Sequence, residues 1–318
     1  MPASIFQIII GLVLLTIGAE ALVRGSSSLA LRLKVSPVVI GLTIVAYGTS
    51  MPEMVVSVKS ALADQGAIAI GNVVGSNIFN IAVILGLSSL AFPLKINIKL
   101  LRSDTPIMII AAFLFAVFFR DHKLGFFEGA VLLLFILFYI IYNFLAAKRA
   151  SSTELALMKV EIAEFKYFKN IYLEIVTILL GFSILILGAH FLIKGSVKFA
   201  QLVGMSEAVI GLTIIAVGTS LPELATSLVA SIHKKPDIAV GNIIGSNIFN
   251  ILGILGVATL ISPINGKGIK SFDIYVMLAV SIILFPFMWS HFEIKRWEGF
   301  VLVAIYIGYM FYLGSAAS

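Results

Sequence analysis

Two stretches of this sequence are near copies of two others. Residues 41–53 read GLTIVAYGTSMPE and residues 211–223 read GLTIIAVGTSLPE, which are identical at 10 of 13 positions. A second pair follows at the same offset of 170 residues, because residues 71–81 read GNVVGSNIFNI and residues 241–251 read GNIIGSNIFNI. Similarity at a fixed offset indicates that the chain consists of two related halves.

The composition around these repeats is that of an integral membrane protein. Of the 318 residues, 60% are hydrophobic and 12% are charged, and the mean hydropathy is +1.10. That leaves too little polar surface to cover a water-soluble globule. A helix needs about 20 apolar residues to cross about 30 Å of hydrocarbon, and ten apolar runs approach or exceed that length. They lie near residues 4–23, 37–63, 67–92, 104–119, 126–146, 172–193, 206–230, 237–262, 273–290 and 297–314.

The sequence therefore predicts an all-α integral membrane protein with ten transmembrane helices, arranged as two inverted-topology five-helix repeats. The expected units are a first repeat at residues 1–146, a linker at 147–170 and a second repeat at 171–318. Because five is an odd number, the second repeat should cross the membrane in the opposite sense to the first. Inverted repeats are typical of secondary transporters, which bind their ions at the midplane where the halves meet.

The basic residues predict the orientation of the chain. Assigning the short loops alternately to two sides places 15 of the 22 Lys and Arg residues on one side, which is cytoplasmic by the positive-inside rule. Both termini are then extracytoplasmic, and the linker is cytoplasmic. The first apolar run lacks a basic n-region and a small-residue cleavage site, so we expect a retained span. The basic residues stand singly rather than in a patch, so no nucleic acid is expected as a partner.

The first motif places a proline and a carboxylate inside an apolar helix, once in each half. Its members are Thr49, Ser50, Pro52 and Glu53 in the first half, and Thr219, Ser220, Pro222 and Glu223 in the second. Because proline lacks an N–H and clashes with the preceding turn, each helix is expected to break here and to leave the carbonyls around Ala46 and Ala216 without partners. The spacing Ser50-x-x-Glu53 also predicts a capping box at the start of the second half-helix.

The paired carboxylates of Glu53 and Glu223 need a charged partner. A carboxylate at the bilayer centre costs about 2.5–3.5 kcal/mol even on the lenient insertion scale. No Lys or Arg lies near the middle of any apolar run to compensate for them. A cation site is therefore favoured over a purely structural pair.

The second motif lines one helix face of each half with oxygen-bearing side chains four residues apart. They are Asn72, Ser76 and Asn80 in the first half, and Asn242, Ser246 and Asn250 in the second. The GxxxG spacings at 71–75 and 241–245 also favour close helix packing, with polar groups joining the helices. Both interpretations can hold together, because close packing would bring Ser76 and Asn80 within reach of Glu53.

All the candidate ligands in these motifs are oxygen atoms. They are the carboxylates of Glu53 and Glu223, the hydroxyls of Thr49, Ser50, Ser76, Thr219, Ser220 and Ser246, the amides of Asn80 and Asn250, and the carbonyls around Ala46 and Ala216. This set suits calcium better than magnesium, which retains its own water, and sodium uses the same ligands. Transition metals are disfavoured, since the chain has no cysteine and its four histidines lie in predicted loops or near a span end.

The paired GTSxPE and GNxxGSNIxN blocks resemble the two α-repeats of the cation/calcium exchanger superfamily, specifically its compact prokaryotic sodium/calcium exchangers with a short central loop. The resemblance covers essentially the whole chain. It implies a multi-pass protein of the cell membrane in which broken helices form a rigid core, while the first and sixth helices slide across it to alternate access. By matching positions, it implies that the carboxylate, hydroxyl and carbonyl groups named above bind calcium and sodium, with Asn80 and Asn250 bordering the central position.

The same resemblance leaves the coupling ion to be decided. Several members have an aspartate where this chain has Asn250, which leaves two acidic groups and a fixed charge that one calcium neutralises. Proton-coupled relatives resemble GNxxE at the second motif, where this chain has Gly75 and Ser76. Calcium–sodium antiport, electrogenic and by alternating access, is therefore the favoured function. A proton-coupled cation antiporter is the alternative, and a passive cation channel is a less favoured one.

No enzyme activity is expected from these motifs. An intramembrane hydrolase needs a base beside its nucleophile, and no His or Lys accompanies the motif serines. An ATP-driven pump would need a phosphate loop of the GxxxxGK[ST] type, which the sequence lacks. No cofactor is expected, and the expected partners are calcium and sodium ions and the lipid bilayer, with no obligatory protein partner.

Overall fold

The computed structural model describes residues 2–148, 168, 170–203 and 216–317, referred to below as the described residues. The first half contains α1 (Pro2–Arg32), α2 (Pro37–Ile40), η1 (Gly41–Val45), α3 (Ala46–Thr49), α4 (Met51–Leu62), α5 (Gly66–Phe79), η2 (Asn80–Leu85), α6 (Gly86–Ala91), β1 (Leu94–Lys95), η3 (Leu100–Asp104), α7 (Thr105–Phe118), η4 (Phe119–Asp121), β2 (Lys123–Leu124) and α8 (Phe126–Lys148). The second half contains α10 (Ile171–Leu202), α12 (Ala216–Gly218), α13 (Leu221–Ile232), α14 (Pro236–Ile248), η6 (Phe249–Ile254), α15 (Leu255–Ile261), β3 (Ile264–Asn265), α16 (Ser271–Trp289), η7 (Ser290–Phe292), β4 (Glu293–Ile294) and α17 (Arg296–Ala317).

Within the described residues, eight helices are long and apolar enough to cross a membrane, or nine if one bent pair is counted as a single span. The bent pair is Pro37–Thr49 followed by Met51–Leu62, which meet at 47°. The chain is therefore a mostly helical, multi-pass membrane protein. Most of the predicted linker at 147–170 and the beginning of the predicted span near 206–230 lie outside the described residues, and so does part of the ten-span prediction.

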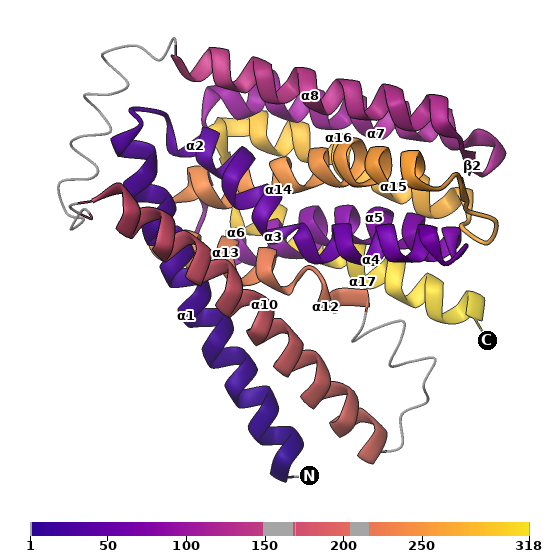
Figure 1. Cartoon of the computed structure of the whole chain (residues 1–318), viewed down its shortest axis with the longest axis horizontal. Coiled ribbons are helices and arrows are strands. Elements are labelled where there is room, and N and C mark those ends of the chain that lie inside the picture. Colours follow the sequence, from indigo (N-terminus) through magenta and orange to yellow (C-terminus); the bar gives the residue numbers. More distant parts are fainter. Residues whose placement is uncertain (1, 149–167, 169, 204–215, 318) are drawn as a thin grey trace.

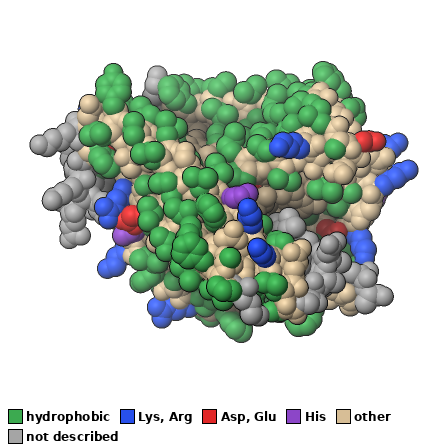
Figure 2. All heavy atoms as spheres, turned by 60° about the horizontal axis from the view of Figure 1, so that its bottom comes forward, with side chains coloured by type: hydrophobic (Ala, Val, Ile, Leu, Met, Phe, Trp, Pro, Cys, Tyr) green, Lys and Arg blue, Asp and Glu red, His purple; other side chains and the backbone are tan. Residues whose placement is uncertain are grey.

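The outer surface matches a lipid environment. Figure 2 shows hydrophobic side chains over most of one face, with acidic and basic side chains at its left and right margins and a few further in. Large apolar side chains such as Phe6, Phe138 and Phe311 are 63%, 70% and 75% exposed. Burying such groups in hydrocarbon removes them from water, which is the arrangement expected of spans within a bilayer.

Two long helices form a pair that projects from the main bundle. Helices α1 and α10 run side by side in Figure 1, with the N-terminal end of α1 and the C-terminal end of α10 extending away from the other helices. Gly11 faces Leu192 and Gly25 faces Ile178, so the two helices are antiparallel. Each helix carries a glycine stripe, three glycines seven residues apart, at Gly11, Gly18 and Gly25 in α1 and at Gly181, Gly188 and Gly195 in α10. The two stripes face each other and allow the backbones to approach closely.

The predicted helix break in the first motif is confirmed at Ser50, between α3 and α4. Pro52 lies in the first turn of α4, and it lacks the N–H that would bind the carbonyl of Gly48, four residues earlier. Two local predictions here are wrong. The carbonyl of Ala46 is not without partners, since it accepts the N–H of Ser50 at 3.0 Å. Ser50 and Glu53 form no capping box, since the Ser50 hydroxyl caps no backbone N–H of α4 and points elsewhere.

Short strands join the two halves at the ends of the bundle. Strand β1 pairs antiparallel with β4, and β2 pairs antiparallel with β3. An offset of 170 residues converts β1 into β3 and β2 into β4, so the two pairings are the same contact made twice. The two halves therefore make reciprocal contacts at these strands, which lie outside the repeated sequence blocks.

The glycine stripe predicts that Gly18→Val destabilises the protein. A Cβ at Gly18 would lie 2.8 Å from the backbone nitrogen of Leu185 and 2.9 Å from the carbonyl oxygen of Gly181, so the pair must separate. Overpacking of this kind costs about 1–3 kcal/mol. Thermal unfolding of the detergent-solubilised protein should show a lower midpoint for Gly18→Val than for the control Gly308→Val, at which no described atom lies within 4 Å of a Cβ. Equal midpoints would contradict the close packing of α1 on α10.

Candidate cation-binding site

Each motif glutamate is held by a serine from the other half of the chain. Ser50 Oγ donates to Glu223 Oε1 at 2.7 Å. Ser220 Oγ donates to Glu53 Oε1 at 2.9 Å. All four side chains are at most 1% exposed, and the two carboxylates are close enough to interact electrostatically. The two bonds are related by the offset of 170 residues, so each half completes the other, and Glu53 and Glu223 are called the crossed glutamates below.

The crossed glutamates keep one oxygen each without a donor. Oε2 of Glu53 and Oε2 of Glu223 are buried, and no hydrogen-bond partner reaches either of them among the described residues. An ionised carboxylate has acceptor sites only, so a proton donor or a cation must satisfy these atoms. Burying a charge without such a partner would cost several kcal/mol.

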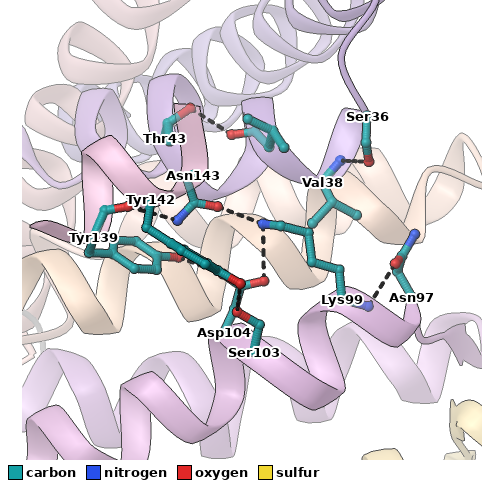
Figure 3. A network of polar contacts seen from close by, with 11 residues as sticks. Ser36, Val38, Thr43, Asn97, Lys99, Ser103, Asp104, Tyr139, Tyr142 and Asn143 are labelled. Carbon is teal, nitrogen blue, oxygen red and sulfur yellow. Dashed lines mark hydrogen bonds and ion pairs between the residues drawn. The ribbon is translucent and has the colours of Figure 1, made fainter. Parts of the chain in front are cut away.

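Two other buried acids do have a basic partner. Asp104 Oδ2 lies 3.3 Å from Lys99 Nζ, and Tyr139 donates to the other carboxylate oxygen at 3.0 Å (Figure 3). Glu174 Oε2 accepts a hydrogen bond from Arg32 Nε at 2.7 Å. The fold thus supplies its own cation to these two acids and none, among the described residues, to the crossed glutamates. A carboxylate can bind a mobile cation only if it is not already paired with a lysine or an arginine.

Of the two remaining motif serines, one reaches a crossed glutamate through Ser220 and the other reaches a backbone carbonyl. Ser76 Oγ on α5 lies 3.1 Å from Ser220 Oγ, which brings it to the carboxylate of Glu53. Ser246 Oγ on α14 donates to the carbonyl of Ala46 at 3.3 Å. Ala216 begins α12, and the residues directly before it lie outside the described residues.

The motif threonines bind the first asparagine of the second motif. Thr49 Oγ1 lies 3.2 Å from Asn242 Oδ1 and donates to it. Thr219 Oγ1 donates to Asn72 Oδ1 at 3.4 Å. These contacts again join the two halves. Each threonine oxygen still has a lone pair that can accept a hydrogen bond or coordinate a cation.

The amides of Asn80 and Asn250 make a second set of buried contacts between the halves. Both side chains are buried, and the Oδ1 atom of each has no partner among the described residues. Their Nδ2 atoms donate to Asn247 and Asn77, two residues to which sequence reasoning gave no role. A spacing of three residues, which places Asn77 on the same side of the helix as Asn80, is the signal that could have identified them.

The helix geometry around these amides is unusual. Asn80 begins the π-helical segment η2, and Asn250 lies in the π-helical segment η6. Single π-helical turns within α-helices occur often at functional sites. The predicted close packing at 241–245 is confirmed, because a Cβ at Gly245 would lie 2.5 Å from the carbonyl oxygen of Leu42. At 71–75 no described atom lies within 4 Å of a Cβ at Gly75, and Leu212, the equivalent of Leu42, lies outside the described residues, so the prediction for that spacing stays a prediction.

Across the two motifs, four buried side-chain oxygens have no hydrogen-bond donor in the part of the chain that the structure describes. They are Oε2 of Glu53, Oε2 of Glu223, Oδ1 of Asn80 and Oδ1 of Asn250. Carboxylate and amide oxygens are the ligands that hard cations such as calcium and sodium prefer. The donor set therefore fits a hard cation and offers no sulfur or imidazole ligand among these residues.

Ser50→Ala should destabilise the ion-free protein. The substitution leaves Oε1 of Glu223 without its donor in addition to Oε2, and an unsatisfied buried acceptor costs about 1–3 kcal/mol. The control is Ser183→Ala, which removes a hydroxyl that bonds only to the carbonyl of Leu179 on an exposed face of α10. Thermal unfolding without added ions should give the lower midpoint for Ser50→Ala. If both variants unfold at the same temperature, the crossing contact does not hold the carboxylate.

Several proteins that this chain resembles in sequence and fold carry the names of exchangers or antiporters. The family model described as sodium/calcium exchanger protein matches the chain twice, at residues 3–145 and 173–314. The putative antiporter CaxA of Alkalimonas amylolytica is 38% identical over 99% of this chain and 100% of its own length. The sodium/calcium exchanger MaX1 of Methanosarcina acetivorans is 36% identical over 95% of this chain and 96% of its own length. A structure of the sodium-calcium exchanger NCX_Mj superposes with a TM-score of 0.84 at 30% identity, covering 98% of this chain and 99% of the other. This chain therefore belongs to the sodium/calcium exchanger protein family, a family of cation exchangers in the membrane.

Proposed function

We propose that this protein is a secondary active antiporter that exchanges calcium for sodium across the membrane by alternating access, with net movement of charge. The observation that carries the proposal is the pair of crossed glutamates. Each is buried, each is fixed by a serine of the other half, and each keeps one oxygen free of any described donor. The names of MaX1 and NCX_Mj support sodium as the coupling ion.

The proposed ion ligands are the twelve residues that the two motifs supply. They are Glu53, Glu223, Thr49, Ser50, Thr219, Ser220, Ser76, Ser246, Asn80 and Asn250, with the carbonyls of Ala46 and Ala216. The Ala46 carbonyl already accepts the N–H of Ser50 and lies 3.3 Å from the hydroxyls of Ser246 and Thr49, so it can reach an ion only after those hydroxyls turn away. The carboxylates, hydroxyls and side-chain amide oxygens of the set each keep a lone pair available.

We further propose that the halves are five-helix units at residues 1–146 and 171–318, inverted relative to each other, with a cytoplasmic linker at 147–170 and both termini outside. The reciprocal strand pairings and the reciprocal serine–glutamate bonds support a two-fold relation between the units. The glycine-packed pair of α1 and α10 is then suited to move as one body against the bundle, because the two backbones meet directly within the pair, whereas α10 meets Gly48 and Gly218 of the bundle through the side chains of Phe182 and Ile193.

Calcium-45 uptake into proteoliposomes tests the proposed function. Vesicles loaded with sodium should accumulate calcium, whereas sodium-free vesicles with only a pH gradient should not. Uptake driven by the pH gradient alone would favour a proton-coupled antiporter. Calcium efflux that persists without any cation on the opposite side would favour a passive channel.

Glu53→Gln and Glu223→Gln should each abolish sodium-driven calcium uptake. The amide keeps the shape of the side chain but removes half of the negative charge that compensates for dehydration of the ion. A suitable control is Glu298→Gln, since Glu298 is equally buried but both of its oxygens already accept hydrogen bonds, from Ser290 and from the N–H of Lys295. Near-normal uptake by both site variants would reject the assigned carboxylates.

The exchange rate should respond to membrane potential. If more than two sodium ions move per calcium, net charge crosses the membrane, and each charge gains or loses about 2.3 kcal/mol per 100 mV. A potassium gradient with valinomycin, inside-positive or inside-negative, should therefore change the initial uptake rate in opposite directions. An unchanged initial rate would indicate electroneutral exchange.

A further inference from the structure

Four asparagines from the two halves meet in the centre of the molecule. Asn80 Nδ2 donates to Asn247 Oδ1 at 2.9 Å, and Asn250 Nδ2 donates to Asn77 Oδ1 at 3.0 Å. The offset of 170 residues converts Asn77 into Asn247 and Asn80 into Asn250, so these are two copies of one bond. All four side chains are at most 1% exposed, which excludes bulk water as an alternative partner.

The orientation of Asn77 and Asn247 is fixed by the backbone. Asn77 Nδ2 donates to the carbonyl of Asn247 at 3.4 Å, and Asn247 Nδ2 donates to the carbonyl of Asn77 at 3.3 Å. Because a backbone carbonyl can only accept, the amide nitrogen of each side chain must face it. The amide oxygen of each must then face the other way, toward Asn250 or Asn80.

The fixed orientation of Asn77 and Asn247 in turn fixes the orientation of the amides of Asn250 and Asn80. Since Asn247 presents an oxygen, the group of Asn80 that faces it must be the NH2 group, and the oxygen of Asn80 must point away. The same argument applies to Asn250 through Asn77. The result is that Oδ1 of Asn80 and Oδ1 of Asn250 are the two amide oxygens left without a donor.

We propose that Asn77 and Asn247 are positioning residues, which hold the amides of Asn250 and Asn80 with oxygen rather than NH2 toward the transported cation. The proposal rests on the proposed function, since it assigns a role around the same site. A flipped amide would present two N–H groups to a cation and would remove one oxygen ligand. An asparagine can make this error, whereas an aspartate cannot, because both of its terminal atoms are oxygens.

A structural role alone predicts a different outcome. Buried amides also join helices in membranes, and in that role Asn247 would contribute to stability without affecting which atom Asn80 presents. The calcium affinity of variants that remain folded distinguishes the positioning role from the structural role. Partners that orient metal ligands typically change metal affinity by about 10–100-fold when they are lost.

Asn247→Ala should raise the calcium concentration for half-maximal uptake by about 10-fold or more. Calcium binding should fall to the same extent, measured as the calcium concentration that half-saturates the shift in unfolding temperature. The control is Asn143→Ala, which removes a buried amide on α8 that bonds to Lys99 and to the carbonyl of Tyr139 (Figure 3). Asn143→Ala should lower stability without changing the calcium dependence. A change of less than twofold in Asn247→Ala would overturn the proposal.

A double substitution gives the sharper test. In an Asn80→Asp background the orientation no longer needs to be fixed, so adding Asn247→Ala should change calcium affinity by less than threefold. In the mismatched background Asn250→Asp, Asn247→Ala should still cost about 10-fold, because Asn247 orients Asn80 and not Asn250. Equal losses in both backgrounds would show a structural role and contradict the proposal.

Two further variants, Asn77→Ala and Glu53→Gln, complete the experiment. Asn77→Ala in an Asn250→Asp background repeats the test through the other half if the first combination does not fold. Glu53→Gln distinguishes failure of the positioning role from failure of the proposed ion site. If Glu53→Gln removes calcium binding and Asn247→Ala does not, only the positioning role fails. If Glu53→Gln also leaves binding unchanged, the proposed site itself is wrong.

Discussion

The structure depends on two carboxylates that are buried within the protein and have no basic partner among the described residues. Glu53 and Glu223 are at most 1% exposed, and the described part of the chain supplies a hydrogen bond to only one of the two oxygens of each. Elsewhere the same chain pairs a buried acid with a base, as it does for Asp104 with Lys99. A buried charge is costly unless a partner compensates for it, so the proposed cation would stabilise the two carboxylates by supplying the missing partner.

Each half of the repeat supplies the serine that holds the buried glutamate of the other half. Neither half contains a complete site, because the serine that holds Glu53 belongs to the second half and the serine that holds Glu223 belongs to the first. The asparagine bonds cross in the same way. Interfaces of this kind join the halves through the same groups that are proposed to bind the ion, so a shift between the halves would change the proposed ligand set. That coupling between position and binding is the requirement of an exchanger that must release one ion before it takes the other.

Much of this arrangement could be predicted from sequence, because identical residues at a constant offset must occupy equivalent places. The break at Pro52 and the burial of both glutamates follow from the chemistry of single residues. The partner of Ser50 did not follow, since local spacing favours a capping box and the actual acceptor lies 173 residues away. The orientation of Asn77 depends on a backbone carbonyl of the other half, which no spacing within one helix reveals. The glycine stripe was visible in the sequence, but its partner, α10, was not.

The most direct measurement is a crystal structure of the protein soaked with strontium, which carries the charge of calcium and scatters anomalously. A strong anomalous peak should contact Oε2 of Glu53 and Oε2 of Glu223, at distances slightly longer than the roughly 2.3–2.6 Å typical of calcium–oxygen bonds, because strontium is the larger ion. Glu53→Gln crystals soaked in the same way should lose that peak. A peak beside Asp104 instead, or an occupied site that touches neither crossed glutamate, would contradict the account.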